Sequence, residues 1–150
     1  MADLFGEEKA RFEARYKRMK SLMDKEDLPY GMRTHSYNSR LAQELGKWAE
    51  RKPDGDRIHD ALFRAYFVDN HNLAKPEVLL KTVEQVGLPA DEAREVLASR
   101  LFKDEIDADW KRCYNLGVTG VPTFQLDGSF IVGAQPYEEL EHFVRQSNGD

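Results

Sequence analysis

Apolar residues recur every three or four positions along the first three quarters of the chain, which is the spacing of one face of an amphipathic helix. Several boundaries carry helix signals. Asn38 is a good N-cap, Pro76 suits a first turn, and Gly87 and Gly117 suit left-handed C-terminal positions. The pattern therefore predicts helices at residues 7–25, 39–49, 56–68, 76–86, 90–100 and 103–116.

The period changes to that of β-structure after residue 117. Residues 123–126 and 130–132 are β-branched or aromatic runs. The Asp127–Gly128 pair between them suits a two-residue type I′ hairpin turn, because both of its central residues need a positive φ. Pro136 then takes the first position of a last helix, whose first turn is acidic. We therefore expect a helical region at residues 1–116 and a β-β-α unit at residues 117–150.

Composition narrows the class of protein. A chain of 150 residues, 41% apolar and 33% charged, can bury a core as one globular domain. The net charge of −5 argues against nucleic acid as a partner, and no apolar run approaches the ~20 residues that span a bilayer. The acidic N-terminal stretch lacks the pattern of a signal peptide. A single cysteine also cannot form an internal disulfide. Without a signal peptide or a disulfide we expect a cytoplasmic protein, and without a long apolar run we expect no membrane partner.

Few side chains are candidates for chemistry. The histidines at positions 35, 59, 71 and 142 lack the spacing of metal ligands, so neither a metal nor another cofactor is expected. Cys113, Trp48 and Trp110 occupy apolar helix positions, which predicts that they lie in the core. The basic run at residues 9–20 alternates with apolar residues and indicates a solvated helix face. Pro122 is the strongest candidate, because a proline cannot donate to a β-ladder and belongs at the start or edge of a strand.

Three segments together resemble a known family. They are "YNSRLAQELGKWA" (37–49), "ALFRAYFVDNHNLAKPEVLLKTVEQVGL" (61–88) and "GVTGVPTFQLDGSFIVGAQPYEELEHF" (117–143). Their order resembles the FrnE-like branch of the DsbA family of thiol–disulfide oxidoreductases, with Val121–Pro122 and the "GAQP" turn at 133–136 as the most specific elements. The resemblance implies an α/β, thioredoxin-like fold in partial form, which is rich in helices because a helical insertion precedes the closing β-β-α unit.

The resemblance also implies a site. In such folds the Val-Pro peptide bond is cis and faces a Cys-X-X-Cys motif at the start of a helix. The backbone before the proline pairs with the substrate as an added strand. The first cysteine, whose pKa the helix N-terminus lowers, attacks as a thiolate. On this resemblance, Val121 and Pro122 are expected to bind a protein substrate or a small thiol or disulfide.

The chain departs from the family pattern where the chemistry takes place. It contains one cysteine and therefore no Cys-X-X-Cys motif. We expect it to be the C-terminal part of a longer protein, without the unit that carries the redox cysteines, and inactive in exchange by itself. The strand that begins at Pro122 would then lack a neighbour on one side. Its open edge at residues 123–126 is expected to self-associate, as a homodimer that shares the edge.

Two other interpretations fit the same residues. The glutathione-dependent 2-hydroxychromene-2-carboxylate isomerases and kappa-class glutathione transferases share the Val-Pro unit and a helical insertion, with serine in place of the first cysteine. Alternatively, the chain is a non-catalytic fragment or a binding module that retains the peptide-docking groove. The "GAQP" turn at 133–136 favours the FrnE-like branch.

Overall fold

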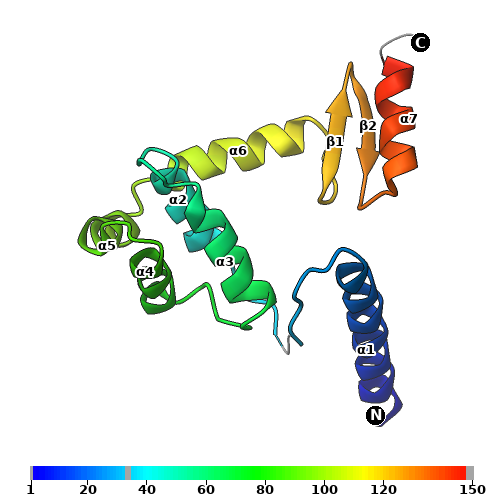
Figure 1. Cartoon of the computed structure of the whole chain (residues 1–150), viewed down its shortest axis with the longest axis horizontal. Helices are drawn as coiled ribbons and strands as arrows, with labels where there is room; N and C mark the ends of the chain where they lie inside the picture. The colour runs from blue at the N-terminus through cyan, green and yellow to red at the C-terminus, as the bar shows by residue number, and fades with distance from the viewer. Residues whose placement is uncertain (1, 33–34, 148–150) are drawn as a thin grey trace. The chain divides into compact units, whose positions relative to one another are not determined.

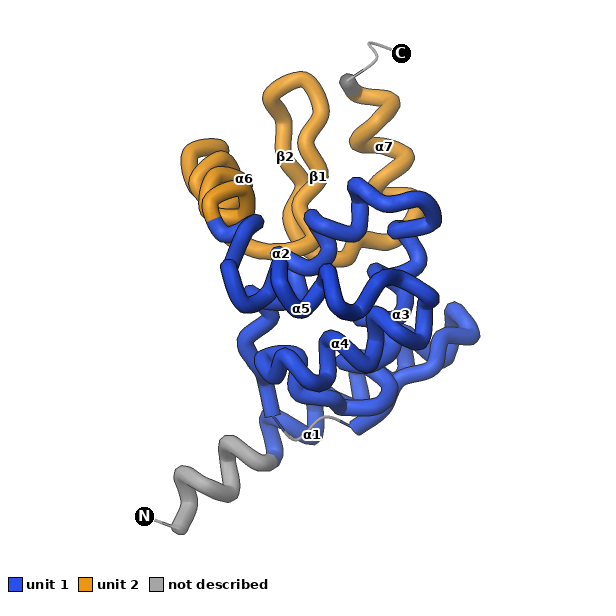
Figure 2. The backbone as a smooth tube through the Cα atoms, turned by 90° about the vertical axis from the view of Figure 1, so that its left-hand side faces the viewer, with its two compact units in different colours: residues 1–103 blue, residues 104–150 orange. Residues whose placement is uncertain are grey.

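Seven α-helices and one β-hairpin make up the described part of the chain, residues 2–32 and 35–147 of a computed structural model (Figure 1). The chain divides into two compact units, Met1–Lys103 and Asp104–Asp150 (Figure 2). In chain order the elements are α1 (Ala2–Lys25), α2 (Arg40–Ala49), α3 (Arg57–Phe67), α4 (Pro76–Gln85), α5 (Ala90–Ser99), α6 (Lys103–Asn115), β1 (Thr123–Leu126), β2 (Ser129–Val132) and α7 (Tyr137–Ser147).

Every element that the sequence predicts is present, and glycines mark the helix ends as expected. Gly87 and Gly117, which follow α4 and α6, have φ values of 78° and 74°. In the hairpin turn φ is 47° at Asp127 and 80° at Gly128, as a type I′ turn requires. The predicted helices, strands and turn are therefore confirmed.

Four predicted helix starts differ from the structure. The first helix begins at Ala2 and not at residue 7, and the starts of α2, α3 and α7 are each wrong by one residue. The N-cap of α2 is Ser39 and not Asn38, whose side-chain Oδ1 instead accepts a hydrogen bond from the Arg40 amide at 2.8 Å. Asn38 thus still satisfies one of the donors that a helix start leaves free, but from outside the cap position. Pro136 precedes the first residue of α7, and its carbonyl accepts a hydrogen bond from the Glu139 amide at 3.1 Å.

The core of the first unit lies between α2, α3, α4 and α5, which contact one another. Trp48 is buried, as predicted, and its indole N–H donates to Glu92 of α5 at 3.0 Å. The helix α1 reaches α3 through stacked rings, with centroid distances of 5.7 Å from Tyr16 to Tyr30 and 6.5 Å from Tyr30 to Phe67. The side chains buried most completely belong to the four core helices and include Leu45, Ile58, Leu79 and Val83.

A carboxylate also lies in this core. Glu44 shares a face of α2 with Leu45 and Trp48, and it is only 1% exposed. Arg100 donates to both of its oxygens, at 2.7 and 2.6 Å, and Arg40 donates to Oε1 at 3.1 Å. The guanidinium of Arg40 also donates to the Lys103 carbonyl at 3.0 Å. These bonds connect α2 to the end of α5 and to the first residue of α6.

The ion pair sets the protonation of Glu44. The hydrogen bonds from Arg100 hold the pKa of this carboxyl below its usual range, and those from Arg40 act in the same direction. Burial opposes them, because it favours the neutral acid, but the arginines prevail. Glu44 is therefore a buried carboxylate that stays charged because it has two guanidinium partners.

The second unit contains the hairpin and α7. The strands β1 and β2 are antiparallel, with Thr123 opposite Val132 and Leu126 opposite Ser129. The helix α7 runs beside the hairpin (Figure 1), and its Phe143 lines a hollow with Asp127 and Ser129 at the turn. None of the described helices has the length and apolar character needed to cross a membrane.

Replacing Glu44 by glutamine should lower the free energy of unfolding by about 2–3 kcal/mol, because a neutral amide cannot match two guanidinium groups. This loss in free energy of unfolding is small for a broken buried ion pair, because the Arg100 side chain is 41% exposed and water can solvate it. Urea denaturation followed by circular dichroism measures the change. The control is Asp91→Asn, which breaks an exposed pair with Arg94 and should cost less than about 0.5 kcal/mol. Equal losses in the two variants would mean that the pair stabilises little.

The Glu44 contribution should also depend on pH. Because the pKa of Glu44 is lower in the folded than in the unfolded chain, its stabilisation is complete above the unfolded pKa and disappears as the pH falls through the folded value. The difference in unfolding free energy between wild type and Glu44→Gln should be constant near neutral pH and shrink in the acid range, as the pH falls below the ordinary glutamate value of 4.5. Urea titrations across this range measure it. A difference that stays unchanged in acid would contradict the assignment.

Candidate functional site

The segment between α6 and β1 carries the residues that the sequence analysis selected. It begins at Gly117, and the amide of Val118 donates back to the Cys113 carbonyl at 3.0 Å, which closes α6. Residues 118–122 then run without helix or strand as far as β1. The segment therefore leaves a helix end and enters the edge of a sheet over a few residues.

Hydrogen bonds from the hairpin hold this segment at its end. The Gly133 amide donates to the Pro122 carbonyl at 2.8 Å, which extends the β1–β2 ladder by one pair. Gly133 has a φ of 90°, a conformation that favours glycine. The Gln135 side chain donates to the Val132 carbonyl at 2.8 Å and fixes the same turn. The "GAQP" turn and the Val-Pro pair, which the sequence analysis singled out separately, are thus directly bonded to each other.

Thr123 holds the segment from the other side of Pro122. Its hydroxyl donates to the Gly120 carbonyl at 2.6 Å. Sequence reasoning missed this role of Thr123 and those of Gly133 and Gln135, although a threonine directly after a strand-initial proline and a glycine before "AQP" were visible signals. The segment is therefore fixed by contacts to its neighbours and not by the side chain of Val121.

Val121 is highly exposed, with 90% of its surface accessible. The Val121–Pro122 peptide bond is cis, which is the isomer that the sequence analysis expected. Within the described residues, neither the amide nor the carbonyl of Val121 has a hydrogen-bond partner. A free donor and a free acceptor on one exposed residue are the groups that an extended chain uses to add as a strand.

The surroundings of Val121 are uncharged. Residues 117–126 contain no acidic or basic side chain, in a chain with 22 Lys and Arg and 27 Asp and Glu residues. Leu116 and Phe124, which precede and follow the segment in the chain, are each 40% exposed. Main-chain groups and apolar surface are therefore what this part of the molecule offers to a ligand.

Two residues predicted to lie in the core do not lie there. Cys113 is exposed, and Trp110 is 61% exposed. Both lie on the face of α6 that also carries Ile106, which is the one buried residue of this helix. Apolar spacing correctly identifies a helix face, but it does not say how far along the helix another element covers that face. The prediction was wrong for this reason.

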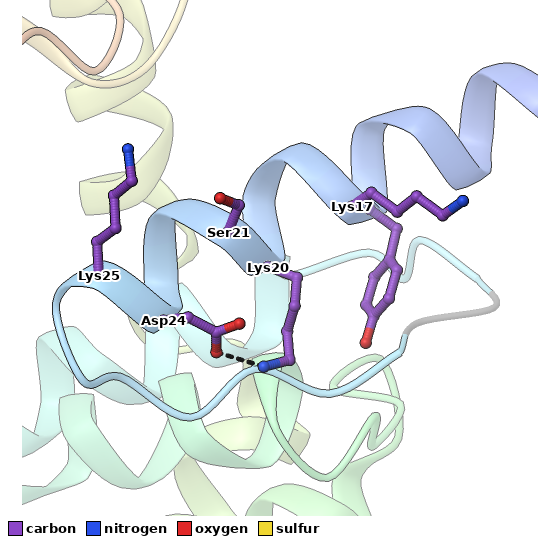
Figure 3. A pocket seen from close by; sticks show the side chains of 6 residues that line it. Lys17, Lys20, Ser21, Asp24 and Lys25 are labelled. Atoms are coloured by element: carbon purple, nitrogen blue, oxygen red, sulfur yellow. Dashed lines mark hydrogen bonds and ion pairs between the residues drawn. The ribbon is translucent and has the colours of Figure 1, made fainter.

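The other candidate side chains form no site. His35, His71 and His142 are exposed and His59 is half-buried. Across residues 2–32 and 35–147, no three His, Cys, Asp or Glu side chains come together in a group that could hold a metal ion. A hollow on α1 is lined by Tyr16, Lys17, Lys20, Ser21, Asp24 and Lys25, and Lys20 is paired with Asp24 (Figure 3). All six residues belong to one helix, and the lysines flank an open surface, as expected for a solvated basic face.

Glu44 is the buried charged residue that the sequence analysis missed. Its position was visible, because residue 44 falls on the apolar stripe formed by Leu41, Leu45 and Trp48. An acidic residue on such a stripe needs a basic partner. Arg40, one turn earlier, was a visible candidate, whereas Arg100 lies 56 residues away and could not be inferred from spacing.

Comparison with known proteins gives consistent matches. Residues 2–145 match the family model of the DSBA-like thioredoxin domain. The uncharacterized protein YwbO of Bacillus subtilis (strain 168) is 30% identical over 111 residues, which are 73% of this chain and 55% of that protein. The crystal structure of a probable DsbA oxidoreductase from Streptomyces coelicolor matches with a TM-score of 0.78 and 30% identity, over 91% of this chain and 60% of that one.

These matches have two consequences. They confirm the predicted fold class, α/β and thioredoxin-like with a large helical part. They also show that the chain spans between 55% and 60% of the length of the relatives it matches.

The exposure of Cys113 gives a simple prediction. In the folded chain its thiol should react with Ellman's reagent within about tenfold of the rate for the urea-unfolded chain, because the side chain of Cys113 is exposed. Absorbance of the released thionitrobenzoate measures both rates, and Cys113→Ser provides the blank. If the thiol reacted only after unfolding, the face of α6 would be covered and the core prediction would be restored.

Proposed function

The chain belongs to the family of DSBA-like thioredoxin domains, and on this basis we propose that it serves thiol–disulfide exchange. In this proposal residues 1–150 supply the substrate-binding part of the site, at Val121 and Pro122. The observation that carries the proposal is the exposed Val121, whose amide and carbonyl have no hydrogen-bond partner within the described chain.

The substrate of this site is an extended polypeptide or a small thiol or disulfide. An extended chain beside Val121 would accept a hydrogen bond from its amide and donate one to its carbonyl. The bonds from Gly133 to Pro122 and from Thr123 to Gly120 hold these groups in place before the substrate arrives. Preorganisation of this kind reduces the entropy lost on binding. Recognition through the main chain accepts many substrate sequences.

Exchange also needs a dithiol. A thiolate attacks one sulfur of the substrate disulfide, forms a mixed disulfide and releases the other substrate sulfur as a thiolate. The thiolate of a second cysteine then attacks the sulfur of the first cysteine, which forms a disulfide between the two cysteines and releases the remaining substrate sulfur as a thiolate. Residues 1–150 contain one cysteine and cannot complete this cycle. We propose that the Cys-X-X-Cys pair comes from residues other than these 150, with Val121 and Pro122 on the substrate side of the site.

Two features favour an oxidoreductase over a glutathione-dependent isomerase or transferase. The matched solved structure is described as a probable DsbA oxidoreductase. The "GAQP" turn, which suggests the FrnE-like branch, is bonded to Pro122 through Gly133. Within this proposal, residues 1–116 are the helical insertion and residues 117–150 the closing β-β-α unit, and the protein works in the cytoplasm.

Binding of an extended peptide to Val121 tests the site. Titration of the isotope-labelled chain with an uncharged heptapeptide of Ser, Thr and Val should shift the amide resonances of Val121 and Gly120, and leave those of α2 to α5 unchanged. The control is the same peptide with every second amide N-methylated, which removes the donors needed for strand pairing. Equal shifts with both peptides, or shifts centred elsewhere, would overturn the assignment of Val121.

A second prediction concerns activity. The chain of residues 1–150 should not accelerate the reduction of insulin by dithiothreitol, because its one cysteine cannot cycle between dithiol and disulfide. The turbidity of precipitating insulin measures the rate, with Cys113→Ser as the matched control. Turnover that is lost in Cys113→Ser would show that the exposed thiol is itself catalytic and would refute the proposed source of the dithiol.

A further inference from the structure

A pocket in the first unit lies between α1 and the segment that follows this helix. It has a volume of about 260 Å³, and the residues that line it are Phe12, Arg15, Tyr16, Met19, Tyr30 and Ser36. We call it the Tyr16–Tyr30 pocket. Tyr16 is the one residue that it shares with the basic hollow on α1, among the described residues that line the two.

Contacts within the chain fix the walls of this pocket. The rings of Tyr16 and Tyr30 are stacked with their centroids 5.7 Å apart, and Tyr30 stacks in turn on Phe67 of α3 at 6.5 Å. Beside Tyr30, the Gly31 amide donates to the Phe67 carbonyl at 2.8 Å. A Cβ atom on Gly31 would lie 2.1 Å from the Val68 carbonyl oxygen, so this close approach requires glycine. The two walls are therefore held together by residues of this chain.

The lining combines aromatic walls with one cation. Phe12, Tyr16 and Tyr30 are half-buried and supply aromatic surface, to which the Met19 thioether adds a polarizable contact. Arg15 is exposed, and among the described side chains it has neither an ion pair nor a hydrogen bond. The described lining contains no acidic residue. A planar apolar group can thus pack on the rings while an anion binds the guanidinium.

We propose that the Tyr16–Tyr30 pocket binds a small aromatic carboxylate. Aromatic rings pack favourably on one another, and a guanidinium donates two parallel hydrogen bonds to a carboxylate. The charge of Arg15 disfavours an organic cation, which is the usual ligand of an aromatic cage. The volume is below the roughly 300–1,000 Å³ of sites for drug-sized ligands, so the ligand has one or two rings.

Two sources can supply this chemistry. One is a free aromatic acid, and the other is a polypeptide that ends in an aromatic residue. Both place a ring within a few bonds of a carboxylate. The site does not depend on the proposed function, because it uses no thiol and none of residues 117–126. Binding here and binding at Val121 therefore succeed or fail separately.

Titration of the isotope-labelled chain of residues 1–150 tests both sources, with 2-naphthoate as the free acid and the tripeptide Gly-Gly-Phe as the polypeptide end. At least one acid should shift the resonances of Tyr16 and Tyr30 with a dissociation constant of about 0.1–3 mM, and should give contacts to the Met19 methyl group. The controls are 2-naphthamide and the C-terminal amide of the tripeptide, which lack the charge. The acid that binds more tightly identifies the source. No shift at about 10 mM of either acid, or equal shifts with the amides, would overturn the proposal.

Two arginine variants test the anion contact. Arg15→Gln should weaken binding of the acid by about fivefold or more, because a neutral amide cannot replace the guanidinium. Arg18→Gln is the matched control, since Arg18 is also exposed on α1 but does not line the pocket, and it should change the affinity by less than about twofold. Equal weakening in the two variants would mean that the general positive charge of α1 attracts the acid, and the proposed site would be wrong.

A second pair of variants tests the aromatic wall. Tyr16→Phe keeps the ring and should bind the acid within about twofold of wild type, whereas Tyr16→Leu removes it and should bind about threefold or more weakly. Circular dichroism checks that both variants fold. Unchanged binding in a folded Tyr16→Leu would contradict the assignment of the pocket.

Discussion

The buried ion pair between Glu44 and Arg100 is the interaction on which the first unit depends. Helix α2 contributes the carboxylate from the middle of its apolar face. Arg100, which is the C-cap residue of α5, donates to both oxygens of this carboxylate. That residue is left-handed, with a φ of 56°, so the chain turns at the residue whose guanidinium reaches the Glu44 carboxylate. Through Arg40 the same carboxylate is linked to the first residue of α6. The Glu44–Arg100 pair thus joins α2 to the end of α5, and Arg40 joins it to the start of α6.

The second unit follows a different principle, because hydrogen bonds to main-chain carbonyls do the positioning there. Gly133 holds Pro122, Thr123 holds Gly120, and the type I′ turn sets the register of the hairpin. The result is an exposed residue with free backbone groups at the start of a sheet edge. Rigid supports around an unsatisfied main-chain segment are what a site needs when it recognises the backbone of its ligand.

Local patterns were sufficient to predict most of the fold. Period-3.6 spacing gave the helices, and the Asp127–Gly128 pair gave the hairpin, because both are decided by contacts between near neighbours. The order of three segments identified the family. Features decided by distant residues could not be predicted, such as the pairing of Glu44 with Arg100 and the exposure of Cys113 on an apolar helix face. At the candidate site the sequence marked Val121 and Pro122, but the bond that joins them to the "GAQP" turn appears only in three dimensions.

The support of Pro122 by Gly133 has an evolutionary consequence. A surface built from main-chain atoms leaves its own side chains free to vary, since any residue other than proline at position 121 presents the same amide and carbonyl. The residue at position 133 has no such freedom, because its φ of 90° disfavours every side chain with a Cβ atom. Selection on this site should therefore act most strongly on a glycine outside the proposed substrate contact, and least on the valine that makes it.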